Sequence, residues 1–88
     1  MNISEYCDTI NVNLVVRRYH NQKERWSASI ENAEVKQNGC LLGAYGNGNT
    51  PMGAIADYIK QIRGETIVLN AMSELRREFT VPSSLELP

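Results

Sequence analysis

The sequence predicts a single α+β domain: a three-stranded antiparallel meander, one amphipathic helix packed on one face, and then a fourth strand. Three observations support this β-β-β-α-β two-layer sandwich. Two segments alternate apolar and polar residues before an Asn-Gly pair, a later segment repeats apolar residues at helical spacing, and a β-branched run follows it. With 88 residues, the chain is long enough to build one small core.

The first two strands are predicted from period-two alternation. Residues 12–19, "VNLVVRRY", form the first strand, residues 20–24 form a polar loop, and residues 25–31, "RWSASIE", form the second strand. The apolar residues expected on the inner face are Val12, Leu14, Val16, Trp26, Ala28 and Ile30. We therefore expect Trp26 in the core rather than as an exposed platform on which bases stack.

The apolar pattern shifts after the second strand. Beyond Asn32 the inward positions move by one residue, to Ala33 and Val35, which predicts a bulge inside a continuing strand. The pair Asn38-Gly39 predicts a tight hairpin turn, because both residues accept positive φ readily. Residues 40–45, "CLLGAY", are then the third strand.

The helix is predicted from its caps and its period. Thr50 is the expected N-cap, Pro51 the first helical residue, and Gly64 the left-handed residue that ends the helix. Asp57 is expected to face solvent. The apolar stripe comprises Met52, Ile55, Ala56, Ile59 and Ile62. The tyrosines expected at the rim of the core, with hydrated hydroxyls, are Tyr19, Tyr45 and Tyr58.

The rest of the chain completes the domain. Residues 65–71, "ETIVLNA", predict a fourth strand that lies parallel to a neighbour after the helical crossover. Phe79 and Val81 indicate a short extra strand or a docked arm. We expect residues 1–11 to be an N-terminal arm or short helix, residues 12–81 to form the domain, and residues 82–88 to be a frayed tail.

Composition and charge exclude several classes of function. The net charge of −1 gives the whole molecule no field that attracts nucleic acid or membranes. No apolar run approaches the roughly 20 residues that span a bilayer, and the first residues lack the pattern of a signal peptide. We therefore expect a cytoplasmic protein with no membrane partner. There, Cys7 and Cys40 are expected to be reduced and buried, with a disulfide as the alternative.

The topology also argues against catalysis. The 20–24 loop and the start of the helix fall at one edge of the predicted sheet, and Cys40 falls at the other, on the order of 20 Å away. His20, the single histidine, therefore cannot act as a base for Cys40. Without C-x-x-C or a second histidine, no metal site is predicted. We expect no catalytic residues, no cofactor and no enzymatic activity.

Residues 43–50, "GAYGNGNT", have the spacing of a phosphate-binding P-loop, but Asn49 stands where that loop requires lysine. We therefore reject nucleotide hydrolysis. The structural interpretation is that Gly43 relieves crowding against the helix, while Gly46 and Gly48 supply positive φ in a tight strand-to-helix turn.

A binding role for the same loop remains open, because the predicted edge also carries a cluster of cations. A helix N-terminus with exposed N–H groups and nearby cations would form a site for an anion or for an acidic partner. The residues assigned to this site are Arg17, Arg18, His20, Lys23, Arg25, Gly46, Asn47, Gly48, Asn49 and Thr50.

Residues 48–54, "GNTPMGA", resemble the G-[DE]-T-x-E-E-A element that opens the helix in the partial RNase-H-like domain of HicB-type antitoxins. Gly48, Thr50 and Ala54 agree with that element, and the acidic pair before the alanine is missing. The resemblance implies a similar strand order and a non-catalytic domain that works by binding a protein. Size and polar tail also resemble small accessory proteins of phages and mobile elements.

We therefore predict a small non-enzymatic protein that acts through protein–protein interaction, as an inhibitor or antitoxin-like factor from a phage or mobile element. An exposed edge strand would allow a homodimer or strand addition to a partner. The alternative is a nucleic-acid-binding module that uses the basic first hairpin and the glycine loop.

Overall fold

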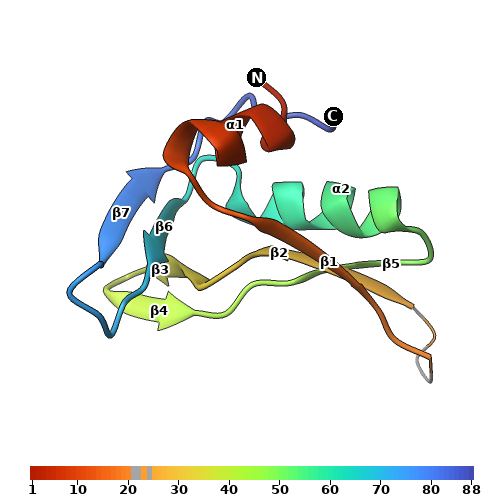
Figure 1. Ribbon diagram of the computed structural model, residues 1–88, viewed down its shortest axis with the longest axis horizontal. Coiled ribbons are helices and arrows are strands. Elements are labelled where there is room, and N and C mark those ends of the chain that lie inside the picture. Colours follow the sequence, from red (N-terminus) through yellow and green to blue (C-terminus); the bar gives the residue numbers. More distant parts are fainter. Residues whose placement is uncertain (21–22, 24) are drawn as a thin grey trace.

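The computed structural model describes residues 1–20, 23 and 25–88, which contain two helices and seven strands (Figure 1). The predicted α+β class is confirmed. The strands form two sheets, and all the paired strands within each sheet are antiparallel. Helix α2 (Pro51–Ile62) lies along the first sheet, and helix α1 (Ile3–Ile10) lies near the chain termini. No helix in the described ranges has the length and apolarity needed to cross a bilayer.

The first sheet contains β1 (Leu14–Arg18), β2 (Trp26–Ile30) and β5 (Gly46–Gly48), in the order β1-β2-β5. Side chains alternate between its two faces. Leu14, Val16, Ala28 and Ile30 share the face that packs in the core with α2, as the alternation predicts. Trp26 is half-buried against the same core. Neither helix of the described residues covers the opposite face (Figure 1).

The second sheet contains β3 (Ala33–Gln37), β4 (Cys40–Leu42), β6 (Thr66–Leu69) and β7 (Arg77–Thr80), in the order β4-β3-β6-β7. The predicted continuous second strand is therefore wrong, because it divides into β2 and β3 at Asn32, which has a φ of 61°. Continuing the β2–β5 register would place residue 39 opposite Val35, whereas Leu42 lies there, a shift of three residues. A one-residue bulge cannot absorb this shift, so the predicted third strand also divides, into β4 and β5.

The expectation of a parallel fourth strand is also wrong. Strand β6 pairs antiparallel with β3, with Val35 opposite Ile67. Strand β1 begins at Leu14, opposite Ile30 at the end of β2, and does not extend alongside β3. Strand β6 therefore occupies that side of β3. The extra strand expected around Phe79 is present as β7, which pairs with β6.

Both termini pack on the domain, and of the two alternatives expected for residues 1–11 the structure has the short helix, α1. Asn2 caps α1, and its side chain accepts from the Glu5 N–H while the Glu5 carboxylate accepts from the Asn2 N–H, a capping box. At the other end, Leu85 is buried, and Ile3 N–H donates to the Glu86 carbonyl over 2.9 Å. The expected fraying of residues 82–88 therefore does not describe this segment, because Leu85 fills part of the core beneath α1.

Helix α2 begins as predicted, with the Thr50 hydroxyl accepting from the Gly53 N–H over 2.9 Å and Pro51 in the first turn. Gly64 follows the helix with a φ of 74°. The buried face differs in part from the predicted stripe, since Met52 is exposed and Ala56 only half-buried. Its buried members are Ala54, Ile55, Tyr58, Ile59 and Ile62.

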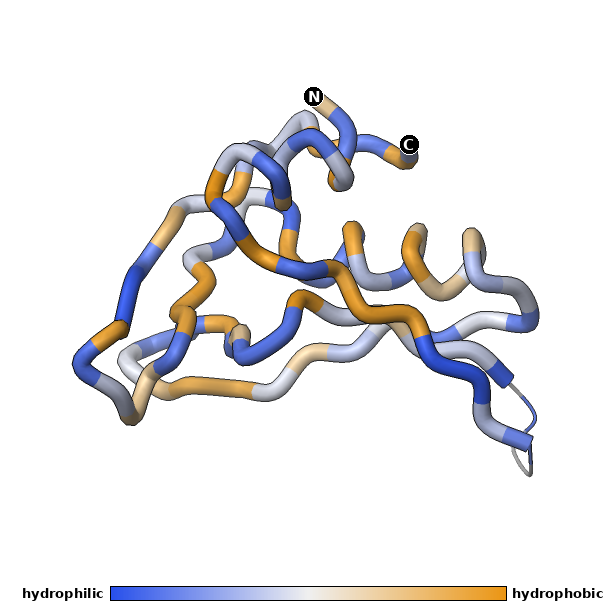
Figure 2. Tube along the Cα trace, viewed as in Figure 1, coloured by the Kyte–Doolittle hydropathy of each residue, from blue (hydrophilic) through white to orange (hydrophobic). Residues whose placement is uncertain are grey.

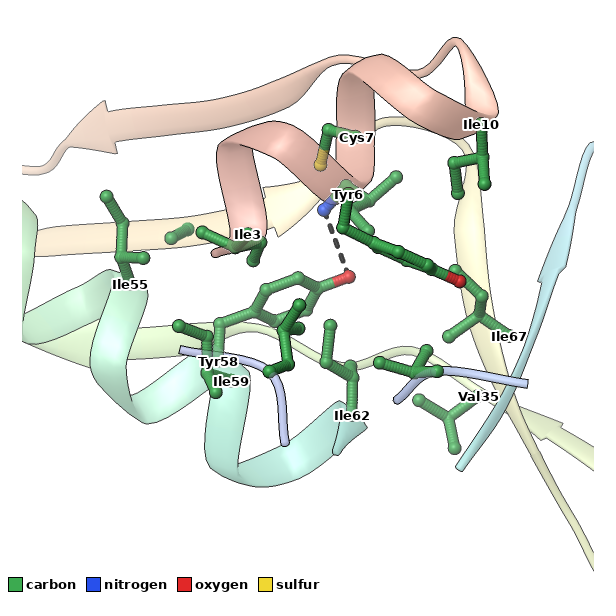
Figure 3. Close-up of a cluster of buried hydrophobic side chains, with 14 of the residues drawn as sticks. Ile3, Tyr6, Cys7, Ile10, Val35, Ile55, Tyr58, Ile59, Ile62 and Ile67 are labelled. Carbon is green, nitrogen blue, oxygen red and sulfur yellow. Dashed lines mark hydrogen bonds between the residues drawn. The ribbon is translucent and has the colours of Figure 1, made fainter. Parts of the chain in front are cut away.

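Tyr58 contradicts the expectation of a hydrated rim position. It is 1% exposed, and its hydroxyl accepts a hydrogen bond from the Ile30 N–H over 3.0 Å (Figure 3). Burial raises the pKa of the Tyr58 phenol to about 12. The residue thus joins α2 to the end of β2 from inside the core.

Candidate functional site

The cations predicted for the site lie on and beyond the ends of β1 and β2. Figure 2 shows β1 change from apolar to hydrophilic toward this end. The exposed residues there are the cationic Arg17, Arg18, Lys23 and Arg25 together with His20. The ion pairs among the described residues, Lys36–Glu78 and Arg76–Glu78, involve none of them. Asn21, Gln22 and Glu24, which complete the predicted loop, lie outside the described residues.

Within this cluster, Arg18 contacts the ring of Trp26. The two residues are cross-strand partners, and the Arg18 guanidinium carbon lies 5.8 Å from the centroid of the Trp26 ring. This distance fits a cation–π interaction. Trp26 in turn pairs with Gly48 of β5. The cationic strand ends and the start of α2 therefore share one end of the molecule, as the strand directions predict, and β4 with Cys40 begins at the other end (Figure 1).

The glycines of the loop have a different role from the one predicted. Gly46 and Gly48 are strand residues of β5, and neither is among the residues with positive φ. A Cβ on Gly46 would lie 2.0 Å from the Ala54 carbonyl oxygen, and one on Gly48 would lie 2.6 Å from the Ala54 nitrogen. These glycines are therefore required because β5 touches the backbone of α2. Gly43 was expected to relieve crowding against the helix, but a Cβ added there would meet only the Tyr45 ring, at 3.5 Å.

The start of α2 offers few free donors for an anion. Pro51 has no N–H, the Gly53 N–H donates to the Thr50 hydroxyl, and the Ala54 N–H donates to the Thr50 carbonyl. Of the first-turn amides, this leaves Met52 for an external acceptor. Asn49, at the lysine position of the P-loop pattern, is exposed. The phosphate-binding interpretation of this loop therefore has little support from its hydrogen bonds.

Asn47 and Asp57 close the free edge of β5. The Asn47 N–H donates to the Asp57 carboxylate over 2.9 Å, and the Gln61 amide donates to the Tyr45 carbonyl over 2.7 Å and to Asp57 over 3.2 Å. Asp57 is half-buried rather than freely solvated, which corrects the expectation for this residue. Side chains of α2 thus occupy the hydrogen-bonding positions that a further strand would use.

Sequence reasoning missed a groove on the helix-free side of the first sheet, which we call the outer groove. It has a volume of about 700 Å³. Its floor includes Ser27 and Ser29 of β2, and its walls include Tyr19, Tyr45 and Met72. The groove exists because the two sheets diverge at Asn32 and Gly43, and because the β6–β7 connection, residues 70–73, lines its far side.

The walls of the outer groove expose large apolar surface. Tyr19 is 42% exposed, Tyr45 61% and Met72 99%. Ser27, in contrast, is 7% exposed, because it lies between Arg17 and Asn47 in the register. Arg17 lines one part of the groove, and Glu31 and Glu34 line another. The alternation of "RWSASIE" could have indicated the outward serines, but no local pattern indicates the residues that come from the β6–β7 connection.

The thiols differ in environment. Cys7 is buried, as expected, and burial raises its pKa to about 11, which disfavours the reactive thiolate. Cys40 is exposed, contrary to expectation, because it begins the short edge strand β4. Both are free thiols, and Cys40 lies at the opposite end of the molecule from the end of β1, which His20 follows. In the part of the chain that the structure describes, no cluster of His, Cys, Asp and Glu is arranged to hold a metal.

No protein family, curated protein or solved structure matches this chain. The likeness of residues 48–54 to the HicB element thus stays a prediction. Within this chain, its agreeing residues have structural explanations: Gly48 and Ala54 are in backbone contact, and Thr50 caps α2.

Proposed function

We propose that this domain is a non-enzymatic protein-binding module that holds an extended peptide segment of its partner in the outer groove. The observation that carries the proposal is the groove itself, an open sheet face with a small polar floor between aromatic walls. Its volume of about 700 Å³ falls within the range of ligand sites, roughly 300–1,000 Å³. The predicted likeness to HicB-type domains, which implies protein binding, points in the same direction.

The dimensions of the floor suit a short extended segment. Strand β2 and its flanking residues, from Arg25 to Glu31, advance six residues, which at about 3.3 Å per residue is on the order of 20 Å. Ser29 offers a hydroxyl group along that line, while Tyr19 and Tyr45 supply flat apolar surface on either side. Tyrosines contribute large contact area at low cost in side-chain entropy, which is typical of peptide-binding surfaces.

The charges along the groove favour a peptide over a polynucleotide. Arg17 lies toward the cationic end, whereas Glu31 and Glu34 lie toward the bend between the sheets. A nucleic acid carries the same negative charge along its whole length and would be repelled by the acidic half. A peptide can place an acidic residue beside Arg17 and a basic residue beside Glu31 and Glu34.

Selection from a library of displayed random peptides tests this function. We expect enriched sequences to carry acidic and basic residues at opposite ends of an apolar centre. Tyr45→Ala should weaken their binding at least tenfold, and Arg17→Glu should shift the selection from acidic to basic at one end. Met52→Ala is the matched control, because Met52 is 48% exposed but lies on α2 outside the groove.

The proposal fails if the enriched peptides bind the Tyr45→Ala and Arg17→Glu proteins as well as they bind the wild type. It also fails if Met52→Ala weakens binding as much as Tyr45→Ala. Circular dichroism of each variant should match that of the wild type, since Tyr45 and Arg17 are exposed side chains.

A second candidate function is nucleic-acid binding by the cationic end. It is favoured by one specific observation, the Arg18 guanidinium over the Trp26 ring, with Arg17, Lys23 and Arg25 exposed nearby. A single-stranded oligonucleotide should then change Trp26 fluorescence, with an affinity that falls steeply as salt rises. Arg18→Glu combined with Lys23→Glu should abolish the effect, and Lys60→Glu on α2 should not. Binding that ignores both salt and the double substitution would reject this function.

A further inference from the structure

We propose that two copies of this chain associate through their β1 strands, which pair antiparallel across a two-fold axis at Val16 and join the two first sheets into one of six strands. The inference concerns the edge of the sheet and is independent of the peptide groove. Its basis is that the two edges of the first sheet differ: one is closed by side chains of the same chain and the other is open.

The alternation of hydrogen bonds identifies the open groups on β1. Tyr19 N–H donates to the Arg25 carbonyl and Glu31 N–H donates to the Asn13 carbonyl, so the odd-numbered residues of β1 face β2. The N–H and C=O groups of Leu14, Val16 and Arg18 therefore point away from β2. No hydrogen bond from residues in the described ranges reaches them.

The other edges in the described structure are less suitable for strand pairing. At β5 the outward Asn47 N–H is bound by Asp57, and Gln61 binds the neighbouring Tyr45 carbonyl. Strand β4 has three residues, and the same alternation leaves Leu41 as its outward member. Strand β7 has four residues, and β1 has five. Strand β1 is thus the longest edge with open backbone groups.

A second copy fits this edge better than an unrelated strand because the sequence of β1 is complementary to itself. Pairing about Val16 sets Leu14 opposite Arg18 of the second copy and Val15 opposite its Arg17. No cation then faces a cation. The half-buried Val16 side chain meets its counterpart on the α2 side of the sheet, and the half-buried Leu14 side chain lies diagonal to Val16 of the second copy. Cross-strand neighbours of this kind stabilise an antiparallel pair.

Charge also selects the antiparallel orientation. The cationic end of β1 in one copy would lie beside the Asn13 end of the other, where Glu31 accepts from the Asn13 amide over 3.2 Å. A parallel arrangement would instead place the two Arg17–Arg18 ends together, where like charges repel. Because β1 also forms one wall of the outer groove, the pairing would place two grooves side by side on one face.

Amide hydrogen exchange of the full chain, measured at low micromolar and millimolar concentration, tests the interface directly. The Leu14, Val16 and Arg18 amides should exchange rapidly in the dilute sample and at least about tenfold more slowly in the concentrated one. Light scattering should show the mass of a dimer at the high concentration. A monomeric mass at millimolar concentration, or a dimer without protection of these amides, would overturn the proposal.

A pair of proline substitutions gives the matched control. Val16→Pro removes an outward N–H of β1 and should keep the chain monomeric, whereas Leu41→Pro removes the outward N–H of β4 and should leave dimerisation unchanged. Equal dimerisation of both variants would reject the β1 interface. If Val16→Pro does not fold, the exchange pattern of the wild type decides. Protection of the β1 amides by an added acidic peptide, in a chain that stays monomeric, would mean that the second copy is the wrong occupant.

Discussion

Replacing Tyr58 by phenylalanine removes a hydroxyl on which the bend between the two sheets depends. The β2–β5 register uses Trp26 and Ala28 for its hydrogen bonds, so the Ile30 N–H points to the same side. Position 44 would be its partner if β5 continued, but β5 begins at Gly46. The Tyr58 hydroxyl takes the place of that missing carbonyl and accepts from the Ile30 N–H over 3.0 Å inside the core.

Tyr6 provides the opposite case in the same core. It is 6% exposed, and no residue in the described part of the chain forms a hydrogen bond with its hydroxyl. In Figure 3 that hydroxyl points toward Ile67, away from the Tyr58–Ile30 hydrogen bond. Burial raises the pKa of Tyr6, so the phenol stays neutral. Tyr6→Phe therefore removes a desolvated polar group and leaves no partner unsatisfied.

The two substitutions should change stability in opposite directions. Tyr58→Phe leaves a buried N–H without a partner, which costs about 1–3 kcal/mol. Tyr6→Phe relieves a desolvated hydroxyl and should stabilise the domain by about 1 kcal/mol. In a domain of this size each kcal/mol moves the melting temperature by about 4–8 °C. We expect urea and thermal unfolding, followed by circular dichroism, to place the two variants on opposite sides of the wild type.

The reasoning is refuted if Tyr58→Phe leaves the unfolding midpoint unchanged, because the Ile30 N–H would then not depend on the hydroxyl. A marked destabilisation by Tyr6→Phe would equally show that its hydroxyl has a partner. The slope of the urea transition should stay that of the wild type in both variants, since neither changes the surface exposed on unfolding.

Three further predictions follow from other parts of the structure. Gly46→Ala should destabilise the domain by about 3 kcal/mol or more in urea unfolding, because the added Cβ would clash with the backbone of α2. Gly43→Ala should change stability by no more than about 0.5 kcal/mol, because the nearest atom to its added Cβ is 3.5 Å away. Equal effects of the two substitutions would contradict the roles assigned to these glycines. A thiol reagent should modify Cys40 quickly in the native protein and Cys7 only after unfolding, because Cys7 is buried with a pKa of about 11. Prompt reaction of both thiols would contradict the burial of the Cys7 side chain of α1. Hydrogen bonds from Lys36 and then Arg76 lower the pKa of Glu78, so its stabilising contribution is present above the pKa of the unfolded state and is lost as pH falls through the lower folded value. The urea midpoint of Glu78→Gln should therefore lose part of the acid-range dependence that the wild type shows, and identical pH profiles would refute this.

The elements with local signals could be predicted from the sequence. Helix α2 was identifiable because Thr50, Pro51 and Gly64 mark its ends by side-chain and backbone chemistry that acts within a few residues. The strands were identifiable because alternation sets which face a side chain takes. Strand directions then placed the cationic residues beside the start of α2, and this arrangement depends only on the order of the elements.

The bend between the two sheets at Asn32 and the outer groove could not be predicted. Alternation indicates which face of a sheet a side chain takes, but it does not indicate which residues of two strands pair. The three-residue change between the β2–β5 and β3–β4 registers depends on pairing across the hairpin, and Asn32 alone does not indicate it. The groove wall at Met72 comes from a connection distant in sequence. The roles of Gly46 and Gly48 were wrongly predicted for a related reason. A residue without a Cβ can adopt positive φ and can also allow close packing, and only the position of α2 shows which of the two these glycines are needed for.

The position of α2 connects the core to the surfaces proposed for binding. Gly46 and Gly48 let β5 touch the helix backbone, and this contact brings Asp57 and Gln61 to the outward groups of β5. The helix therefore closes one edge and covers one face of the first sheet, and the β1 edge and the serine-floored face stay accessible. A substitution that lifts α2 from β5, such as Gly46→Ala, should consequently free the β5 edge for strand pairing as well as lower stability. New aggregation of that variant, absent from the Tyr58→Phe protein when both are compared at the same unfolded fraction, would separate the opening of the edge from general destabilisation.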